Sequence, residues 1–99
     1  MLIIEYHKDG VHVADHETMA IAETFVGRAN VPDKTFETRI SQAMILDAFR
    51  VLIKRGFVDH KNVKVKFEGR LITVHENGRL ADWPVGLCDF TENYLMELI

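Results

Sequence analysis

The stretch from Val63 to Trp83 reads VKVKFEGRLITVHENGRLADW and alternates apolar with polar residues around two turn signals, Glu68-Gly69 and Asn77-Gly78. Glycine-containing pairs of this kind close tight hairpins, because they accept the positive φ that such turns need. The stretch therefore predicts a three-stranded antiparallel meander. Its predicted strands cover residues 63–67, 70–75 and 79–83.

The two turns also set which side chains share a face of the predicted sheet. Both registers put apolar side chains on one face, and these are Val63, Val65, Phe67, Ile72, Val74, Ala81 and Trp83. Because the two turns are independent signals, their agreement indicates a sheet with one buried face.

Residues 41–55 form the clearest predicted helix of the chain. One broad apolar stripe at helical spacing comprises Met44, Ile45, Ala48, Phe49, Leu52 and Ile53. Such a stripe must be buried, most simply against the apolar face of a sheet. The opposite side of this helix is expected to expose Arg50, Lys54 and Arg55 to solvent.

The N-terminal part of the chain predicts a β-hairpin followed by a helix. Asp9-Gly10 lies between two β-prone runs, which is a strong signal for a two-residue hairpin turn. This turn would place His7 opposite His12. A helix is then expected over residues 15–29 and a short strand over residues 34–40.

After the meander, Pro84 has no N–H for a sheet ladder, so it ends the third strand, and a terminal helix is expected to begin near Asp89 or Thr91. The prediction is an α+β fold: an N-terminal β-hairpin, a helix, a central amphipathic helix, a three-stranded antiparallel meander and a C-terminal helix. One domain over residues 1–99 is expected, since this length supports a single modest core.

The composition is that of a globular chain, because 47% of the residues are hydrophobic and 27% are charged. The formal net charge of -3 argues against bulk attraction to nucleic-acid phosphates. No apolar run approaches the ~20 residues of a membrane-spanning helix, so no membrane contact is expected. A single cysteine cannot form an internal disulfide, which favours a cytoplasmic location.

The sequence lacks the motifs of several large enzyme classes. It contains no phosphate-binding loop, no dinucleotide-binding glycine fingerprint and no Gly-x-Ser-x-Gly elbow. The chain is therefore expected to be non-catalytic, without a resident cofactor, and to act through a protein partner or through self-association.

Three side chains of the predicted N-terminal hairpin form a candidate divalent-metal site. His7 and His12 would be cross-strand neighbours, and Glu5 would lie two residues along the same face. Imidazole and carboxylate groups are ordinary ligands of zinc and similar ions. A small metal-dependent enzyme is thus one alternative, beside the plainer interpretation of a polar hairpin face.

A winged-helix-like nucleic-acid-binding module is the other alternative. The central helix precedes a hairpin with three basic residues, Lys64, Lys66 and Arg70, which could contact phosphates. The helix is mainly apolar, however, and the chain is acidic overall. Nucleic acid is therefore the less favoured partner.

The segment from His75 to Asp89, HENGRLADWPVGLCD, resembles the C-terminal segment of a group of AAA/ABC-type ATPases. These ATPases are related to the overcoming-lysogenization-defect and RecF-like proteins, and many of them belong to bacterial anti-phage loci. The matching residues are Asn77, Gly78, Asp82, Trp83, Pro84, Gly86 and Asp89. Leu87 and Cys88 depart from the pattern, since they stand where that family usually has aromatic residues.

The ATP-binding and hydrolysis motifs of that family are missing from this sequence. The resemblance therefore implies an accessory subunit or partner of such an ATPase in a phage-defence system, or a phage-encoded counterpart. The residues expected to make the interaction are Trp83, Pro84, Val85, Gly86, Leu87 and Asp89. The same residue types also suit a plain sheet-to-helix corner, because proline ends a strand and glycine permits a turn.

Overall fold

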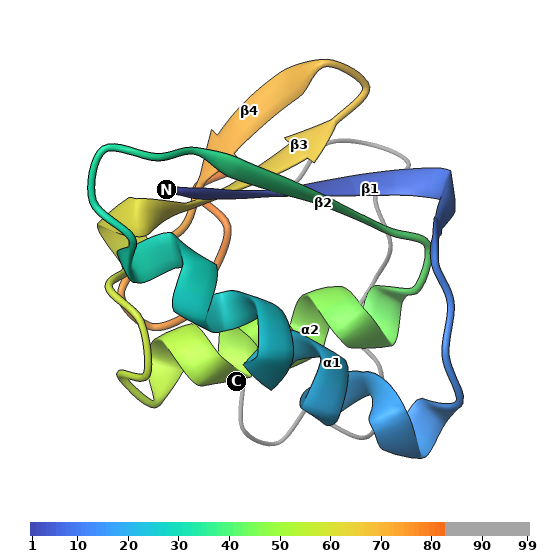
Figure 1. Cartoon of the computed structure of the whole chain (residues 1–99). Helices are drawn as coiled ribbons and strands as arrows, with labels where there is room; N and C mark the ends of the chain where they lie inside the picture. Colours follow the sequence, from blue (N-terminus) through green and yellow to red (C-terminus); the bar gives the residue numbers. More distant parts are fainter. Residues whose placement is uncertain (83–99) are drawn as a thin grey trace.

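The structure, a computed structural model, describes residues 1–82 of the chain (Figure 1). Two α-helices cover one face of a four-stranded sheet in this part of the chain. The strands are β1 (Leu2–Val11), β2 (Phe36–Ile40), β3 (Val63–Phe67) and β4 (Arg70–Thr73). The helices are α1 (Thr18–Val26) and α2 (Ala43–Lys54), with short 3-10 helices η1 (Asp15–Glu17), η2 (Gly27–Asn30) and η3 (His60–Asn62). The α+β class expected from the sequence is confirmed.

The central strand β1 pairs in parallel with β2 on one side and with β3 on the other. β3 pairs antiparallel with β4, so the sheet is mixed and its strand order is β2-β1-β3-β4. The chain moves one way across the sheet from β1 to β2 and the other way from β2 to β3. Because α1 and α2 make these crossovers on the same face, the two crossovers have opposite hands, and one of them is left-handed against the usual preference.

The predicted N-terminal hairpin is wrong. Leu2–Val11 form one strand, and Asp9-Gly10 lies inside it rather than at a turn. The pairing of β1 with β2 is irregular at this point, because Tyr6 and Val11 are both paired with Ile40. The residues between them bulge and the chain then returns to the ladder, so pairing with a distant strand prevails over the local turn signal.

The apolar side chains of this first segment face the core. Leu2 and Ile4 are buried in the core, and Tyr6, Val11 and Val13 pack against the same core from partly buried positions. The strand therefore keeps its apolar face toward the helices although it does not turn at Asp9-Gly10.

The first turn of the predicted meander is confirmed. Glu68 and Gly69 have positive φ values of 50° and 80° and connect β3 to β4. The register places Val65 opposite Ile72, and both side chains are buried as the alternation requires.

The second turn of the predicted meander is present, but its register differs by one residue. Gly78 has a φ of 86°, its N–H donates to the carbonyl of His75, and Leu80 pairs with Val74 in an isolated bridge. The loop is longer than a two-residue turn, so Leu80 is buried in the core and Ala81 is exposed. Within the described residues, the expected third strand is reduced to this bridge.

Both helices share one hydrophobic core with the sheet. Its buried members include Leu2, Ile4, Ile40, Val63, Val65 and Ile72 from the strands, and Ile45, Ala48, Phe49 and Leu52 from α2. α2 is buried on all sides from Ile45 to Ile53, which is typical of a central element rather than a surface helix. None of the helices in residues 1–82 is long and apolar enough to cross a bilayer.

Candidate functional site

The residues expected to form the interaction surface lie outside those that the structure describes: Trp83, Pro84, Val85, Gly86, Leu87 and Asp89. The structure does describe the segment that leads into them. We name residues 74–82 the lead-in hairpin, since they run from Val74 through the Asn77-Gly78 turn to Asp82. Its contacts with the rest of the fold decide where the expected interaction segment begins.

The turn of the lead-in hairpin is closed by backbone bonds and one side chain. The amide of His75 donates to the carbonyl of Arg79 at 2.7 Å, and the Gly78 amide donates back to the His75 carbonyl at 2.9 Å. The Asn77 side-chain Oδ1 accepts a hydrogen bond from the Arg79 amide at 3.0 Å. Asparagine and glycine therefore supply the turn chemistry that the sequence predicts.

A buried ion pair on α2 ties this turn to the core. Asp47 is 0% and Arg50 is 1% exposed, and Arg50 Nη1 lies 3.0 Å from Asp47 Oδ1. The Nε–H of Arg50 donates to the Gly78 carbonyl at 2.8 Å. Gly78 approaches so closely that a Cβ there would lie 2.4 Å from the Arg50 carbonyl oxygen. Glycine alone combines the positive φ with this close approach.

The energetics of the Asp47–Arg50 pair indicate a positional role. Removing charges from water costs on the order of several kcal/mol per ion, and apolar residues of similar volume often stabilise a fold equally well or better. An apolar side chain cannot donate a hydrogen bond to the Gly78 carbonyl, however. The ion pair therefore holds Arg50 where it fixes the position of the lead-in hairpin on α2. Hydrophobic packing alone would fix that position less specifically.

The prediction that Arg50 faces solvent is wrong. It rested on a single apolar stripe, whereas apolar residues surround the helix on every side from Ala43 to Ile53. Asp47 and Arg50 are the two charged residues inside that run, three positions apart. Opposite charges at this spacing lie on one helix face, and charged residues are rarely fully buried unless paired. That pattern is the signal in the sequence that identifies the pair.

The end of the lead-in hairpin is attached to β4. Arg70 Nη2 forms an ion pair with Asp82 Oδ2, with both side chains about half exposed. The amide of Ala81 donates to the Thr73 carbonyl at 2.9 Å. An exposed ion pair adds little stability, but together these contacts define the path of the chain up to residue 82.

The cross-strand histidine pair expected for a metal site does not form. His7 lies in β1, whereas His12 follows the end of the same strand, with its Nδ1 3.5 Å from the Ser41 hydroxyl oxygen. Glu5 forms an ion pair with Arg39 at 2.7 Å. The described part of the chain contains no group of three or more side chains of the kind that hold a metal ion.

The basic residues considered for nucleic-acid contact lie on the sheet, and two of them are engaged in ion pairs. Lys66 Nζ lies 3.8 Å from Glu5 and 3.6 Å from Glu37, and Arg70 pairs as described above. Lys64 lies on the same face of β3 as Lys66. Because α2 is buried, it cannot enter a nucleic-acid groove, and the winged-helix arrangement is not formed.

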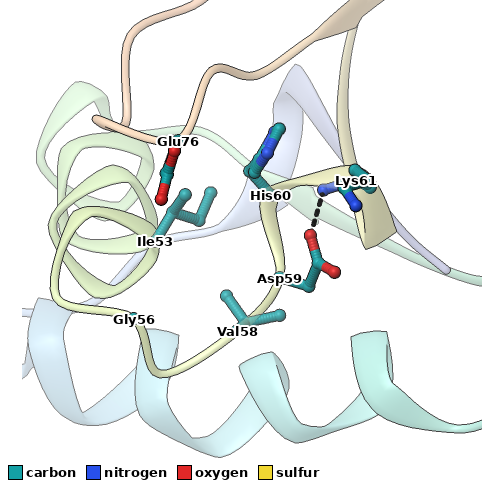
Figure 2. Close-up of a pocket in the computed structure, with 7 residues that line it drawn as sticks. All are labelled: Ile53, Gly56, Val58, Asp59, His60, Lys61 and Glu76. Atoms are coloured by element: carbon teal, nitrogen blue, oxygen red, sulfur yellow. Dashed lines mark hydrogen bonds between the residues drawn. The ribbon is translucent and has the colours of Figure 1, made fainter.

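A pocket of about 470 Å³ with mixed polar and apolar lining lies at the C-terminal end of α2 (Figure 2). It is lined by Ile53, Gly56, Val58, Asp59, His60, Lys61 and Glu76. His60 Nδ1 lies 2.9 Å from the Val74 carbonyl, which only accepts, so Nδ1 carries the proton and Nε2 of the neutral ring is an acceptor. The imidazole acceptor of His60 and the carboxylates of Asp59 and Glu76 can hold a small polar ligand here. The sequence patterns did not indicate that these side chains lie together.

Comparison with known protein families, with characterised proteins and with solved structures finds no match to this chain. Its function is therefore inferred from its own residues and their geometry.

Proposed function

We propose that the chain is a non-catalytic protein-interaction module, an accessory subunit that presents residues 83–89 to a partner. The observation that carries this proposal is the attachment of the lead-in hairpin to the core. The hydrogen bond from Arg50 to the Gly78 carbonyl is buried and 2.8 Å long, which favours joint movement of the hairpin and α2. The interaction segment would therefore begin from a fixed platform.

Such a platform favours binding, because less freedom is lost when the partner arrives. Ordering a flexible side chain at an interface costs about 0.5–1.5 kcal/mol, and pre-ordered elements avoid part of that loss. The residue types of the segment also suit binding. Tryptophan is enriched among the residues that dominate interface energies, and Pro84 restricts the backbone that follows Trp83.

The resemblance of residues 75–89 to the C-terminal segment of anti-phage ATPases supports an ATPase as the partner. A separate chain that carries this segment without the nucleotide-binding motifs can join such an ATPase as an accessory subunit. A phage-encoded counterpart that imitates the segment would engage the same partner. The lone cysteine is compatible with action in the cytoplasm.

Affinity capture from cells that naturally encode the chain tests this proposal, with the captured proteins identified by mass spectrometry. We expect an ATPase to be enriched with the natural sequence and lost with Trp83→Ala. Truncation of an interface tryptophan costs about 2 kcal/mol or more, which is about a thirtyfold loss of affinity. The dissociation constant of the purified pair, measured by calorimetry, should show that loss.

Phe57→Ser is the matched control, because Phe57 is an apolar residue that is 64% exposed in the loop after α2. It should capture the ATPase as the natural sequence does. Circular dichroism and urea unfolding check that Trp83→Ala folds, and Val85→Asp replaces it if it does not. Capture of no ATPase, or equal capture by the natural chain and both segment variants, would contradict the proposal.

A further inference from the structure

The outer edge of β2 carries backbone groups that no strand in residues 1–82 pairs with. β2 is an end strand of the sheet and is bonded to β1 on its other side. The Phe36 amide donates to the Met1 carbonyl, toward β1. Since alternate residues of a parallel strand bond to one neighbour, the backbone groups of Glu37 and Arg39 point away from β1. They form an edge that another strand can join.

The sequence of β2 is complementary to itself in the antiparallel direction. It reads Phe36-Glu37-Thr38-Arg39-Ile40. When two copies are placed antiparallel with Thr38 opposite Thr38, Glu37 lies opposite Arg39 and apolar residues meet on the helix side. Twofold registers centred on Glu37 or Arg39 would instead place like charges opposite each other. The charge pattern therefore selects one register.

The charges on the sheet face opposite α1 and α2 would continue across such a joint. In one row of the sheet, Glu5 lies between Lys66 at 3.8 Å and Arg39 at 2.7 Å, so the signs alternate. Glu37 of a second copy would be the next charge in this row. The Arg39 side chain is 62% exposed although that of Glu5 is 15% exposed, so Arg39 has room for a second carboxylate.

We propose that two copies of the chain join through their β2 edges about a twofold axis at Thr38. Glu37 of one copy and Arg39 of the other form a pair that exchanges both backbone hydrogen bonds, and the axis generates a second such pair. The Thr38 residues meet between these pairs, where facing threonines are favourable. The two sheets become one continuous sheet, and the contact is self-complementary and closed.

This dimer is independent of the proposed binding of an ATPase. β2 and β4 are the outer strands at opposite ends of the sheet, and the lead-in hairpin adjoins β4. The two contacts therefore use different edges, and either can fail without the other. A dimer also presents two lead-in hairpins, which raises the avidity for a multimeric partner.

Sedimentation velocity of the full chain over a concentration series tests the dimer. The natural chain is expected to be dimeric. Arg39→Glu places two acidic residues opposite each other at both pairs, and Glu37→Arg places two basic residues there. Each change should weaken the dimer by about tenfold or more. An equimolar mixture of the two variants should restore a dimer, because an acidic edge then faces a basic edge.

Lys64→Glu is the matched control, because it makes the same charge change as Arg39→Glu on the same face of the sheet but on β3, away from the joined edge. It should remain dimeric. Amide hydrogen exchange provides a second readout, since the Glu37 and Arg39 amides should be protected in the natural chain and exposed in both edge variants. A natural chain that is monomeric throughout the series overturns the proposal, as does a dimer that survives both charge reversals. If Arg39→Glu does not fold, Glu37→Arg and the exchange measurement decide.

Discussion

Two pairs with the same local signal, Asp9-Gly10 and Asn77-Gly78, behave differently in this fold. Asn77-Gly78 reverses the chain, and its glycine has a φ of 86°. Asp9-Gly10 lies inside β1, and its glycine has no positive φ. The residues on either side of Asp9-Gly10 pair with strands far away in the sequence, whereas those around Asn77-Gly78 pair with each other. Turn chemistry is decisive where the flanking residues can form their own hairpin.

Both glycines are nevertheless required by close contacts with distant backbone. A Cβ at Gly10 would lie 2.5 Å from the backbone of Ile40, and one at Gly78 would lie 2.4 Å from the backbone of Arg50. Gly78 carries the conformational requirement in addition. Substitutions can separate the two requirements.

Breaking the ion pair that holds the Asn77-Gly78 turn should have the largest effect. Asp47→Leu removes the carboxylate that lies 3.0 Å from Nη1 of the buried Arg50, and we expect a loss of about 3–5 kcal/mol in the free energy of unfolding. The double variant Asp47→Leu/Arg50→Met should be more stable than the single variant, because the buried guanidinium is removed together with the carboxylate that it pairs with. Urea denaturation measures both. Equal losses in the two variants would show that the charge itself is unimportant.

Gly78→Ala should have the next largest effect, because it adds a clash to a strained backbone. The left-handed conformation costs about 1–2 kcal/mol in a residue with a Cβ, and the overpacking against Arg50 adds about 1–3 kcal/mol. Gly69→Ala is the control, since Gly69 also has a positive φ but a Cβ there would have no close neighbour within 4 Å. Scanning calorimetry should show the larger fall in melting temperature for Gly78→Ala. Equal falls would leave conformation as the sole requirement at Gly78.

Gly10→Ala should destabilise by contact alone. The added methyl group meets the Ile40 backbone, which is held in the ladder, and we expect a loss of about 2 kcal/mol. Gly27→Ala is the control without a positive φ or a close neighbour, and it should be neutral or slightly stabilising. Amide exchange should quicken in β2 for Gly10→Ala and stay unchanged for the control. A Gly10→Ala chain as stable as the natural one would contradict the close approach.

Substitution of Asn77 or Asp9, the first residue of each pair, should have the smallest effects on the free energy of unfolding. Asn77→Ala removes the hydrogen bond to the Arg79 amide and should cost about 1 kcal/mol. Asp9→Ala removes an exposed side chain that lies 3.8 Å from His7, and its effect should stay within about 0.5 kcal/mol. Thermal unfolding followed by circular dichroism compares the two. A larger loss for Asp9→Ala would indicate that Asp9 stabilises the irregular part of β1.

Short-range patterns were enough to predict the α+β class, both helices and the β3–β4 hairpin. Glu68-Gly69 connects two strands that pair with each other, so its local turn preference and the tertiary fold agree. The parallel partners of β1 could not be predicted in the same way, because Phe36–Ile40 and Val63–Phe67 are far from it in sequence and parallel pairing leaves no turn signature.

The candidate site was predictable only in part. The Asn77-Gly78 turn was recognised from its residue types, but the Leu80 register was missed because the loop is longer than a two-residue turn. The His7 and His12 pair depended on the hairpin that does not form. Arg50 also donates to the Gly78 carbonyl, 28 residues away, and a helical pattern alone does not indicate this contact.

Local patterns in the chain specify which segments become helices and strands and which side of each is apolar, because periodicity and turn chemistry act over a few residues. Three features arise only in the assembled fold: which strands are neighbours, which of the two Asx-Gly pairs reverses the chain, and the contact of Arg50 with the Gly78 carbonyl. Those outcomes depend on groups supplied by distant parts of the chain. A strand or a charge acquires its partner only when the whole sheet and its helices come together.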